Sequence, residues 1–121
     1  MSSKSTFSNT TSRSYALALY ELAKEDSELG KAEDEIRGLS RLLIENPDFK
    51  EVILSPTVAI EDKKNIMFAI ADQNNFSKTI KKFLGFVAIK NRLFFLSNII
   101  ESFLKWFKMH FIQILFWLNY L

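Results

Sequence analysis

Few residues of this chain have side chains that could do chemistry. The 121 residues include no cysteine and a single histidine, His110, which has no carboxylate close to it in the sequence. These absences exclude thiolate metal sites, cysteine nucleophiles and histidine-based triads. The acidic pairs Asp34-Glu35 and Glu61-Asp62 are typical of charges at helix starts or facing solvent, not of a catalytic pair. We therefore expect a protein that is not an enzyme and that has no metal, no cofactor and no small-molecule substrate.

The distribution of charge along the chain is more informative than its sum. The net charge is +2, which is too small for a dedicated nucleic-acid-binding protein. Residues 1–62 carry 12 acidic and 7 basic side chains, whereas residues 63–121 carry 9 basic and 2 acidic ones. This asymmetry predicts two electrostatically different faces that meet different partners. An accidental distribution is the alternative.

Apolar residues recur at helical spacing along nearly the whole chain, and no segment alternates as a strand would. The expected helices cover residues 12–24, 27–45, 47–54, 61–73 and 77–90, and a sixth begins near Arg92. Thr11 or Ser12 can cap the first helix, Asn46 can cap the third, and Asn91 breaks the fifth. The predicted core contains Leu19, Ile36, Leu39, Leu43, Ile70, Leu84, Val87, Leu96 and Ile100.

Short connections between the expected helices favour a compact antiparallel bundle. We predict an all-α fold of six helices with an extended aromatic helix at the C-terminal end. Residues 1–11 are expected to form a flexible tail, residues 12–104 the helical domain, and residues 105–121 an atypical aromatic tail.

Two helices have apolar residues outside the face that the core needs. In the first helix, Tyr15, Ala18 and Leu22 form a second face, and in the fifth, Phe86 and Ile89 lie off the core stripe. Such faces suggest the walls of an apolar groove for a partner helix. The alternatives are that both faces of the first helix are internal and that the fifth helix contacts the sixth.

Basic residues gather around the fifth expected helix. They are Lys78, Lys81, Lys82, Lys90 and Arg92. Their functional interpretation is the steering of an acidic partner segment, and a solvated helix face is the default alternative. Arg92, which opens the sixth helix, is expected to reach the end of the fifth helix or Asp72.

The last nineteen residues, from Phe103, contain seven aromatic side chains. After Lys108 only 13 residues remain, and Gln113 and Asn119 interrupt them, so this segment is too short and too polar to span a bilayer. It is also too apolar for an ordinary helix end in water. We expect the sixth helix to continue into it and to expose Phe111 and Trp117. The segment must then bury against the domain, a partner or a bilayer surface, or be a defective terminus.

Three segments occur in an order that resembles a known family. They are RSYALALYELAKE (residues 13–25), ENPDFKEVILSP (45–56) and FLGFVAIKNRLFFLSNIIESF (83–103). Together they resemble the amino-terminal domain of the F-type ATP synthase delta subunit, whose mitochondrial relative is the oligomycin-sensitivity-conferring protein. The most specific piece is the helix–break–helix around Ala88, Asn91, Arg92 and Leu93.

The resemblance implies a six-helix bundle on top of the catalytic head, where the family binds the amino-terminal segment of the alpha subunits. A second domain of the family grips the b subunits of the peripheral stalk. Tyr15, Ala18, Leu22, Lys82, Phe86 and Ile89 become the candidate partner-binding residues. The implied location is peripheral, on the cytoplasmic face of a bacterial inner membrane, with the mitochondrial matrix side second.

The sequence departs from the family pattern after about Leu104, so we expect a truncated chain for which binding to the b subunits is in doubt. Two other functions remain open. One is a small helical nucleic-acid-binding module that uses the lysine-rich second half. The other is a peripheral membrane protein anchored by the aromatic tail.

Overall fold

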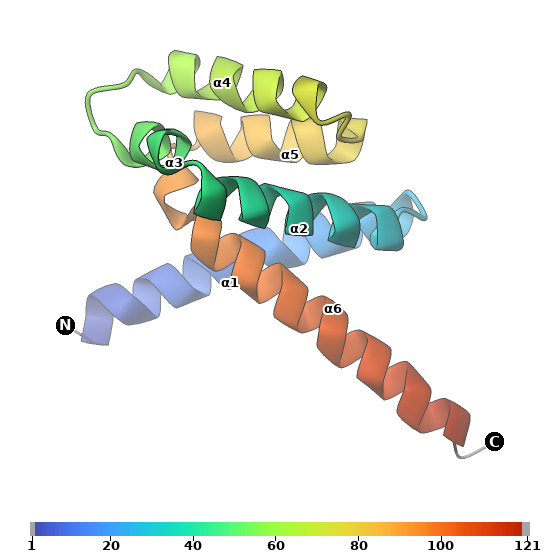
Figure 1. Ribbon diagram of the computed structural model, residues 1–121. Coiled ribbons are helices and arrows are strands. Elements are labelled where there is room, and N and C mark those ends of the chain that lie inside the picture. The colour runs from blue at the N-terminus through green and yellow to red at the C-terminus, as the bar shows by residue number, and fades with distance from the viewer. Residues whose placement is uncertain (1, 120–121) are drawn as a thin grey trace.

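The computed structural model describes residues 2–119, with side chains from Thr10 onward (Figure 1). All the regular elements in this part of the chain are helical, so the all-α prediction is confirmed. The α-helices are α1 (Ser2–Glu25), α2 (Leu29–Glu45), α3 (Pro47–Leu54), α4 (Ile60–Gln73), α5 (Lys78–Ile89) and α6 (Leu96–Asn119). A 3-10 turn, η1 (Leu93–Phe95), joins α5 to α6.

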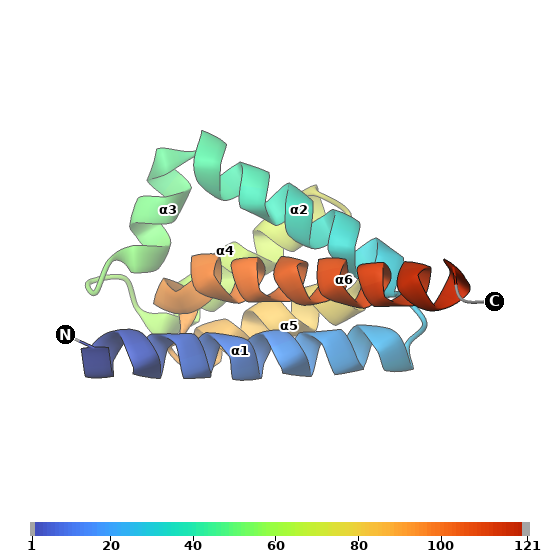
Figure 2. The same cartoon turned by 90° about the horizontal axis from the view of Figure 1, so that it is seen from below.

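The helices pack as two pairs with α2 between them. Helices α4 and α5 lie side by side and antiparallel at one end of the molecule, and α1 packs against α6 at the other (Figure 1). Helix α2 contacts α6, α1 and α5, while α3 packs on α2 and η1. Helices α1 and α6 run in the same direction (Figure 2), so the bundle is not antiparallel throughout as predicted. The four helices between them return the chain to its starting side.

The buried core matches the predicted one at every position except Ile70. The other predicted core residues are 5% exposed or less, whereas Ile70 is half-buried. Helix α4 packs mainly on α5 at the outside of the bundle, so only a narrow stripe of it is covered. That stripe is occupied by Met67 and Ala71.

Helix α1 begins earlier than predicted. It is helical from Ser2, ten residues before the predicted start, while Met1 lies outside the described residues. The flexibility expected of residues 1–11 stays a prediction. Neither glycine nor proline occurs before Gly30, so nothing in the sequence stops the helix near Ser12. Ser12 therefore lies inside the helix and caps nothing. It is buried, and its hydroxyl has no hydrogen-bond partner among the described residues.

The residue between α2 and α3 also acts differently from the prediction. Pro47 occupies the first turn of α3 as expected. However, the side chain of Asn46 does not cap α3, because its amide nitrogen donates to the carbonyl oxygen of Leu42 at 3.2 Å. The side chain of Asn46 thus closes the end of α2, while only its backbone carbonyl, which accepts the N–H of Lys50 at 3.2 Å, belongs to the start of α3.

Three helices end in the same backbone motif. Ser27, Asn75 and Asn91 follow α1, α4 and α5 and have positive φ angles of 57°, 55° and 57°. In each case the next residue donates its N–H back across the last turn, which is the Schellman pattern. These bonds are Glu28 to Ala23 at 2.7 Å, Phe76 to Ala71 at 2.9 Å and Arg92 to Val87 at 3.0 Å. The predicted break at Asn91 is confirmed.

The start of α5 is fixed by a residue from another helix. The side chain of Ser77 accepts the N–H of Ile80 at 3.4 Å and so caps α5. The N–H and the hydroxyl of Ser77 both donate to the carboxylate of Glu35 on α2, each at 2.8 Å. Glu35 is therefore not the solvent charge that we expected, because it ties α2 to the first turn of α5.

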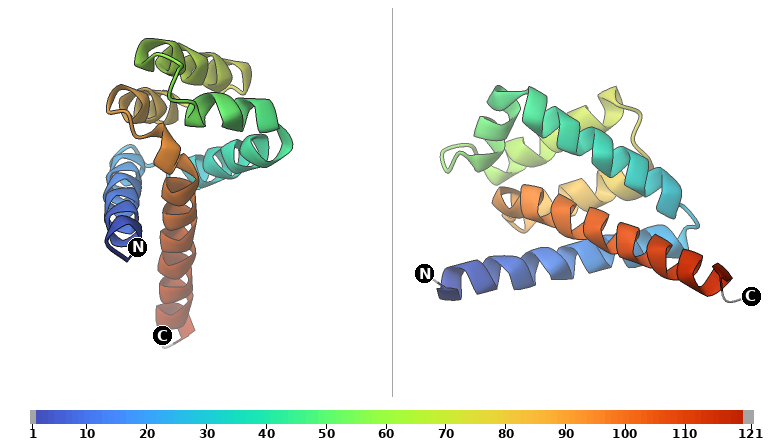
Figure 3. Two further views of the ribbon diagram at one scale, coloured as in Figure 1. Left: turned by 90° about the vertical axis from the view of Figure 1, so that its left-hand side faces the viewer. Right: turned by 60° about the horizontal axis from the view of Figure 1, so that its bottom comes forward.

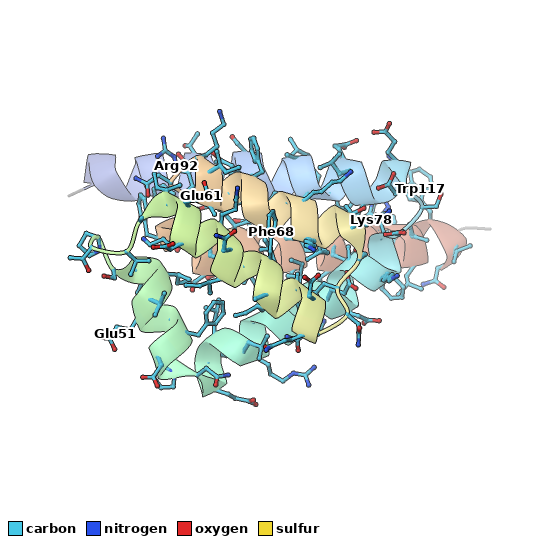
Figure 4. All side chains as sticks on the ribbon, turned by 90° about the horizontal axis from the view of Figure 1, so that it is seen from above. Glu51, Glu61, Phe68, Lys78, Arg92 and Trp117 are labelled. Atoms are coloured by element: carbon cyan, nitrogen blue, oxygen red, sulfur yellow. The ribbon has the colours of Figure 1, made fainter. Side chains whose placement is uncertain are left out.

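Helices α4 and α5 approach each other closely at Gly85. A Cβ atom at this position would lie 2.5 Å from Cε1 of Phe68 on α4. Phe68 lies between the two helices (Figure 4), and the ammonium groups of Lys64 and Lys81 are 5.9 Å and 5.4 Å from its ring centroid. The absence of a side chain at Gly85 thus makes room for the Phe68 ring.

Replacing Gly85 by alanine is expected to lower the free energy of unfolding by about 1–3 kcal/mol, because the Phe68 ring must move to admit the new methyl group. Gly38→Ala is the matched control. Its Cβ would meet only Cε1 of Phe76 at 3.9 Å, so the better helix propensity of alanine should stabilise the protein by about 0.5–1 kcal/mol. Urea unfolding of both variants measures the difference, and equal effects would contradict the close packing at Gly85.

Glu35→Ala is expected to destabilise the protein by about 1–3 kcal/mol, because it leaves the N–H and hydroxyl of Ser77 without their charged acceptor. The neighbouring Asp34 is exposed, so Asp34→Ala should change the stability by less than about 0.5 kcal/mol. Thermal unfolding of both variants tests the contact. The contact would be excluded as a stabilising interaction if the two alanine variants had the same midpoint.

Candidate partner-binding surface

The inner faces of α1 and α5 are occupied by the core. Ala16, Leu19, Tyr20 and Ala23 of α1 are buried, as are Ile80, Phe83, Leu84 and Val87 of α5. A second set of residues on the same helices remains accessible. It consists of Tyr15, Ala18 and Leu22 on α1 and Phe86 and Ile89 on α5, and we call it the α1–α5 surface. Tyr15 is half-buried, Ala18 is exposed, and Leu22, Phe86 and Ile89 are 46%, 47% and 54% exposed.

Two contacts define how the helices are aligned. The rings of Tyr15 and Phe86 meet with centroids 5.9 Å apart and planes tilted by 46°. Beyond the end of α1, Asp26 accepts a hydrogen bond of 2.7 Å from the hydroxyl of Thr79 in the first turn of α5. From the first contact to the second, the residue number increases in the α1 segment, from 15 to 26, and decreases in α5, from 86 to 79. The two helices are therefore antiparallel.

This alignment orders the α1–α5 surface from end to end. Lys82 lies between Thr79 and Phe86 and is therefore beside the stretch of α1 that holds Ala18 and Leu22. Ile89 lies at the opposite end, beyond the contact between Tyr15 and Phe86. The structure thus brings Tyr15 and Phe86 together but keeps Leu22 and Ile89 apart. The two expected walls of the groove meet where Tyr15 contacts Phe86, so they do not enclose a groove there. The α1–α5 surface is instead an elongated apolar strip.

The basic residues around α5 are not equivalent. Lys81 forms an ion pair of 2.8 Å with Asp72 on α4, and the ammonium of Lys90 lies 5.7 Å from the ring centroid of Phe86. Lys82 is exposed and has no acidic side chain within ion-pair distance in the described part of the chain. Lys82 and Lys90 therefore supply positive charge beside the strip.

Arg92 bonds to the residue before it and not to the end of α5. Its guanidinium donates to the carbonyl oxygen of Asn91, just after the end of α5, at 3.4 Å. The expected contact with Asp72 is wrong, because that carboxylate pairs with Lys81.

A pocket that the sequence analysis missed lies between α1 and the distal part of α6. Its volume is about 740 Å³, and Tyr20, Lys24, Trp106, His110 and Phe116 are among the residues that line it. The ring of Tyr20 meets Trp106 and His110 edge-on, with centroids 5.2 Å and 5.7 Å apart. His110 thus packs on Tyr20. The only sequence signal was the spacing of four between Trp106 and His110, which places both on one face of a helix.

The hydroxyl of Tyr20 is buried and has no hydrogen-bond partner within the described residues. Burial and, to a smaller extent, the negative charge of Glu21 raise the pKa of Tyr20. The phenol is therefore neutral at physiological pH. Among the side chains that the structure describes, no group of three or more histidine, cysteine or acidic residues is placed to hold a metal ion.

The aromatic tail extends α6 away from the bundle. The helix continues to Asn119 and runs beyond the other helices (Figure 3), while Tyr120 and Leu121 lie outside the described residues. Phe111 and Trp117 are 55% and 65% exposed, as expected. Trp117 lies near the free end of the helix (Figure 4). No described helix on its own has the length and apolarity to cross a bilayer, although α5 together with residues 93–119 would pass that test as a pair bent by 118°.

Comparison with known proteins identifies the family. Residues 11–113 match the family model described as ATP synthase delta (OSCP) subunit. The chain is 36% identical to the ATP synthase subunit delta of Pelagibacter ubique over 105 residues, which are 87% of this chain and 57% of that protein. It is also 36% identical to the ATP synthase subunit delta of Rhodospirillum rubrum over 91 residues, 75% of this chain and 49% of the relative.

A mitochondrial protein is similar as well. The ATP synthase subunit 5 of Yarrowia lipolytica is 32% identical over 89 residues, 74% of this chain and 42% of that protein. The chain thus spans about half the length of the curated relatives that it matches. The family match continues to residue 113, beyond Leu104, where the sequence analysis placed the departure from the family pattern. The match over most of the chain confirms the predicted resemblance: the chain belongs to the ATP synthase delta (OSCP) subunit family.

Proposed function

We propose that this chain is a non-catalytic connector in the stator of a rotary, proton-translocating ATP synthase. In this proposal it binds the amino-terminal segment of an alpha subunit on top of the catalytic head. The observation that carries the proposal is the exposed α1–α5 surface, in which Leu22, Phe86 and Ile89 are each about half exposed on a chain of this family. Large apolar side chains that remain exposed together mark an interaction site.

The shape and charge of the strip specify its partner. Leu22 and Ile89 lie at opposite ends, which suits a helix laid along the strip with its apolar face inward. Ala18 is the small residue where the backbone of that helix would come closest. Lys82 and Lys90 would face acidic side chains on the flanks of the partner helix.

This assignment concerns residues 12–104 and the head of the complex. Gripping the b subunits belongs, by the family resemblance, to a second domain, and we do not assign it to this chain. As part of the membrane-bound complex, the protein would lie peripherally on the cytoplasmic face of a bacterial inner membrane.

Ala18→Trp is expected to weaken binding of a peptide copy of the alpha-subunit amino terminus at least about tenfold, because the indole would occupy the place of the partner backbone. Leu17→Trp is the matched control, since Leu17 is also exposed on α1 but lies outside the strip. Calorimetry measures the affinities, and circular dichroism checks that both variants fold. Equal affinities for the two variants would contradict the proposed site.

Lys82→Glu is expected to slow association with the same peptide several-fold at low ionic strength, and the difference should vanish near 0.5 M salt, where charges are screened. Lys50→Glu on α3 provides the same charge change at an exposed position outside the strip. Stopped-flow fluorescence measures both rates. Tight binding of a single-stranded oligonucleotide in place of the peptide, falling steeply with salt, would instead support the nucleic-acid function.

A further inference from the structure

The two long edges of the α1–α5 surface carry charges of opposite sign. Glu21 and Glu25 are exposed on α1, and Lys78 and Lys82 are exposed on α5. In each pair the two residues are four positions apart, so they lie on one face of their helix. We call the first pair the acidic edge and the second pair the basic edge.

The acidic edge lies on the side of α1 that is turned away from α5. The hydrogen bond of 2.7 Å from Thr79 to Asp26 marks the side that faces α5. The N–H of Asp26 still donates to the carbonyl oxygen of Leu22 at 3.1 Å, as in a helix. At about 100° per residue, Asp26 and Glu25 therefore lie about 50° to opposite sides of the row that α1 contributes to the surface. Glu21 lies further round in the same direction as Glu25, toward the pocket with α6 that it also lines.

The basic edge lies on the side of α5 that is turned away from α1. Thr79 marks the side of α5 that faces α1, through the same hydrogen bond to Asp26. At about 100° per residue, Lys78 lies about 50° from the row of Phe86 and Ile89 in the opposite direction, and Lys82 lies almost in line with that row. At the end where Asp26 meets Thr79, the apolar strip thus runs between an acidic edge on α1 and a basic edge on α5.

Neither edge is neutralised within the described part of the chain. The ion pairs found there join Glu33 to Arg37, Glu61 to Lys64 and Asp72 to Lys81, and none of them includes a residue of either edge. Like charges four residues apart on one helix repel each other and destabilise that helix. Each edge is such a pair, so a partner with the opposite charges would relieve the repulsion within both edges.

We propose that the partner is an amphipathic helix with one basic and one acidic edge, which lies on the strip with its basic edge against α1 and its acidic edge against α5. This inference rests on the proposed function and adds the charge pattern by which the site selects its partner. Turning such a helix end for end, with its apolar face kept on the strip, exchanges its two edges and brings like charges together. The two edges of the surface therefore also fix the direction in which the alpha-subunit segment lies.

Glu25→Lys combined with Lys82→Glu tests the charged edges, because it reverses one charge on each edge without changing the net charge. Its affinity for a peptide copy of the alpha-subunit amino terminus should fall at least about fivefold at low ionic strength. Asp34→Lys combined with Lys50→Glu is the matched control, since both residues are exposed outside the strip. Calorimetry of the full 121-residue chain measures the affinities, and circular dichroism checks that both variants fold.

A second peptide tests whether the charges are complementary. In it every acidic residue of the first peptide is replaced by lysine and every basic residue by glutamate. It should bind the Glu25→Lys, Lys82→Glu variant more tightly than the unchanged chain, and this preference should disappear near about 0.5 M salt. Equal affinity of the two double variants for the first peptide, or no preference of the second peptide, would overturn the selection by charge and leave the apolar site standing. A first peptide that does not bind the unchanged chain would overturn the proposed function as well.

Discussion

Helix α5 lies against α4, α1 and α2 at once, and this burial on three sides constrains the rest of the bundle. Six of its residues are buried: Ile80, Phe83, Leu84, Gly85, Val87 and Ala88. The lack of a side chain at Gly85 makes room on one side for the Phe68 ring of α4. What remains accessible on α5 is the part of the strip that Phe86 and Ile89 form, with Lys82 beside it, four residues before Phe86 on the same helix face. Any partner of α5 is therefore confined to this strip, next to the outer residues of α1.

The same helix explains part of the uneven charge along the chain. Three lysines, Lys78, Lys81 and Lys82, follow Ser77 in the first turns of α5. The N-terminal end of the helix dipole is positive, so positive side chains are unfavourable there. Acidic side chains from three other segments offset this. Glu35 of α2 accepts two hydrogen bonds from Ser77, Asp26 accepts one from Thr79, and Asp72 of α4 pairs with Lys81. These three acidic side chains thus bind residues of α5 and its N-cap. Lys82 has no such partner among the described residues and can attract an acidic partner segment beside the strip.

The sequence predicted what depends on neighbouring residues and missed what depends on distant ones. The buried stripes of α2 and α5, the start of α5 near Ser77 and the break at Asn91 follow from local periodicity and turn chemistry. The acceptor of Ser77 is Glu35, 42 residues away, and no local pattern points to it. The pocket formed around Tyr20 likewise requires α1 and α6 to run in the same direction, which helix patterns do not specify. The exposure of the candidate binding residues could be predicted from the sequence. Their order along the strip could not, because it depends on the antiparallel alignment of α1 and α5.

In helix α6, one continuous apolar pattern covers a part that is buried in the bundle and a part that is exposed. Its first half buries Leu96, Ile100 and Phe103 against the bundle. Read along the sequence, Phe107 and Ile114 extend that stripe, yet Ile114 is 46% exposed. Leu104 and Phe107 follow Ile100 at spacings of four and three residues, so the distal apolar residues continue the buried stripe with only a small turn around the helix axis. Because α6 diverges from α1 beyond their crossing (Figure 1), the bundle leaves the distal part of this stripe exposed. The exposure of this distal part therefore follows from the geometry of the α1–α6 pair, and its burial requires a surface outside the bundle.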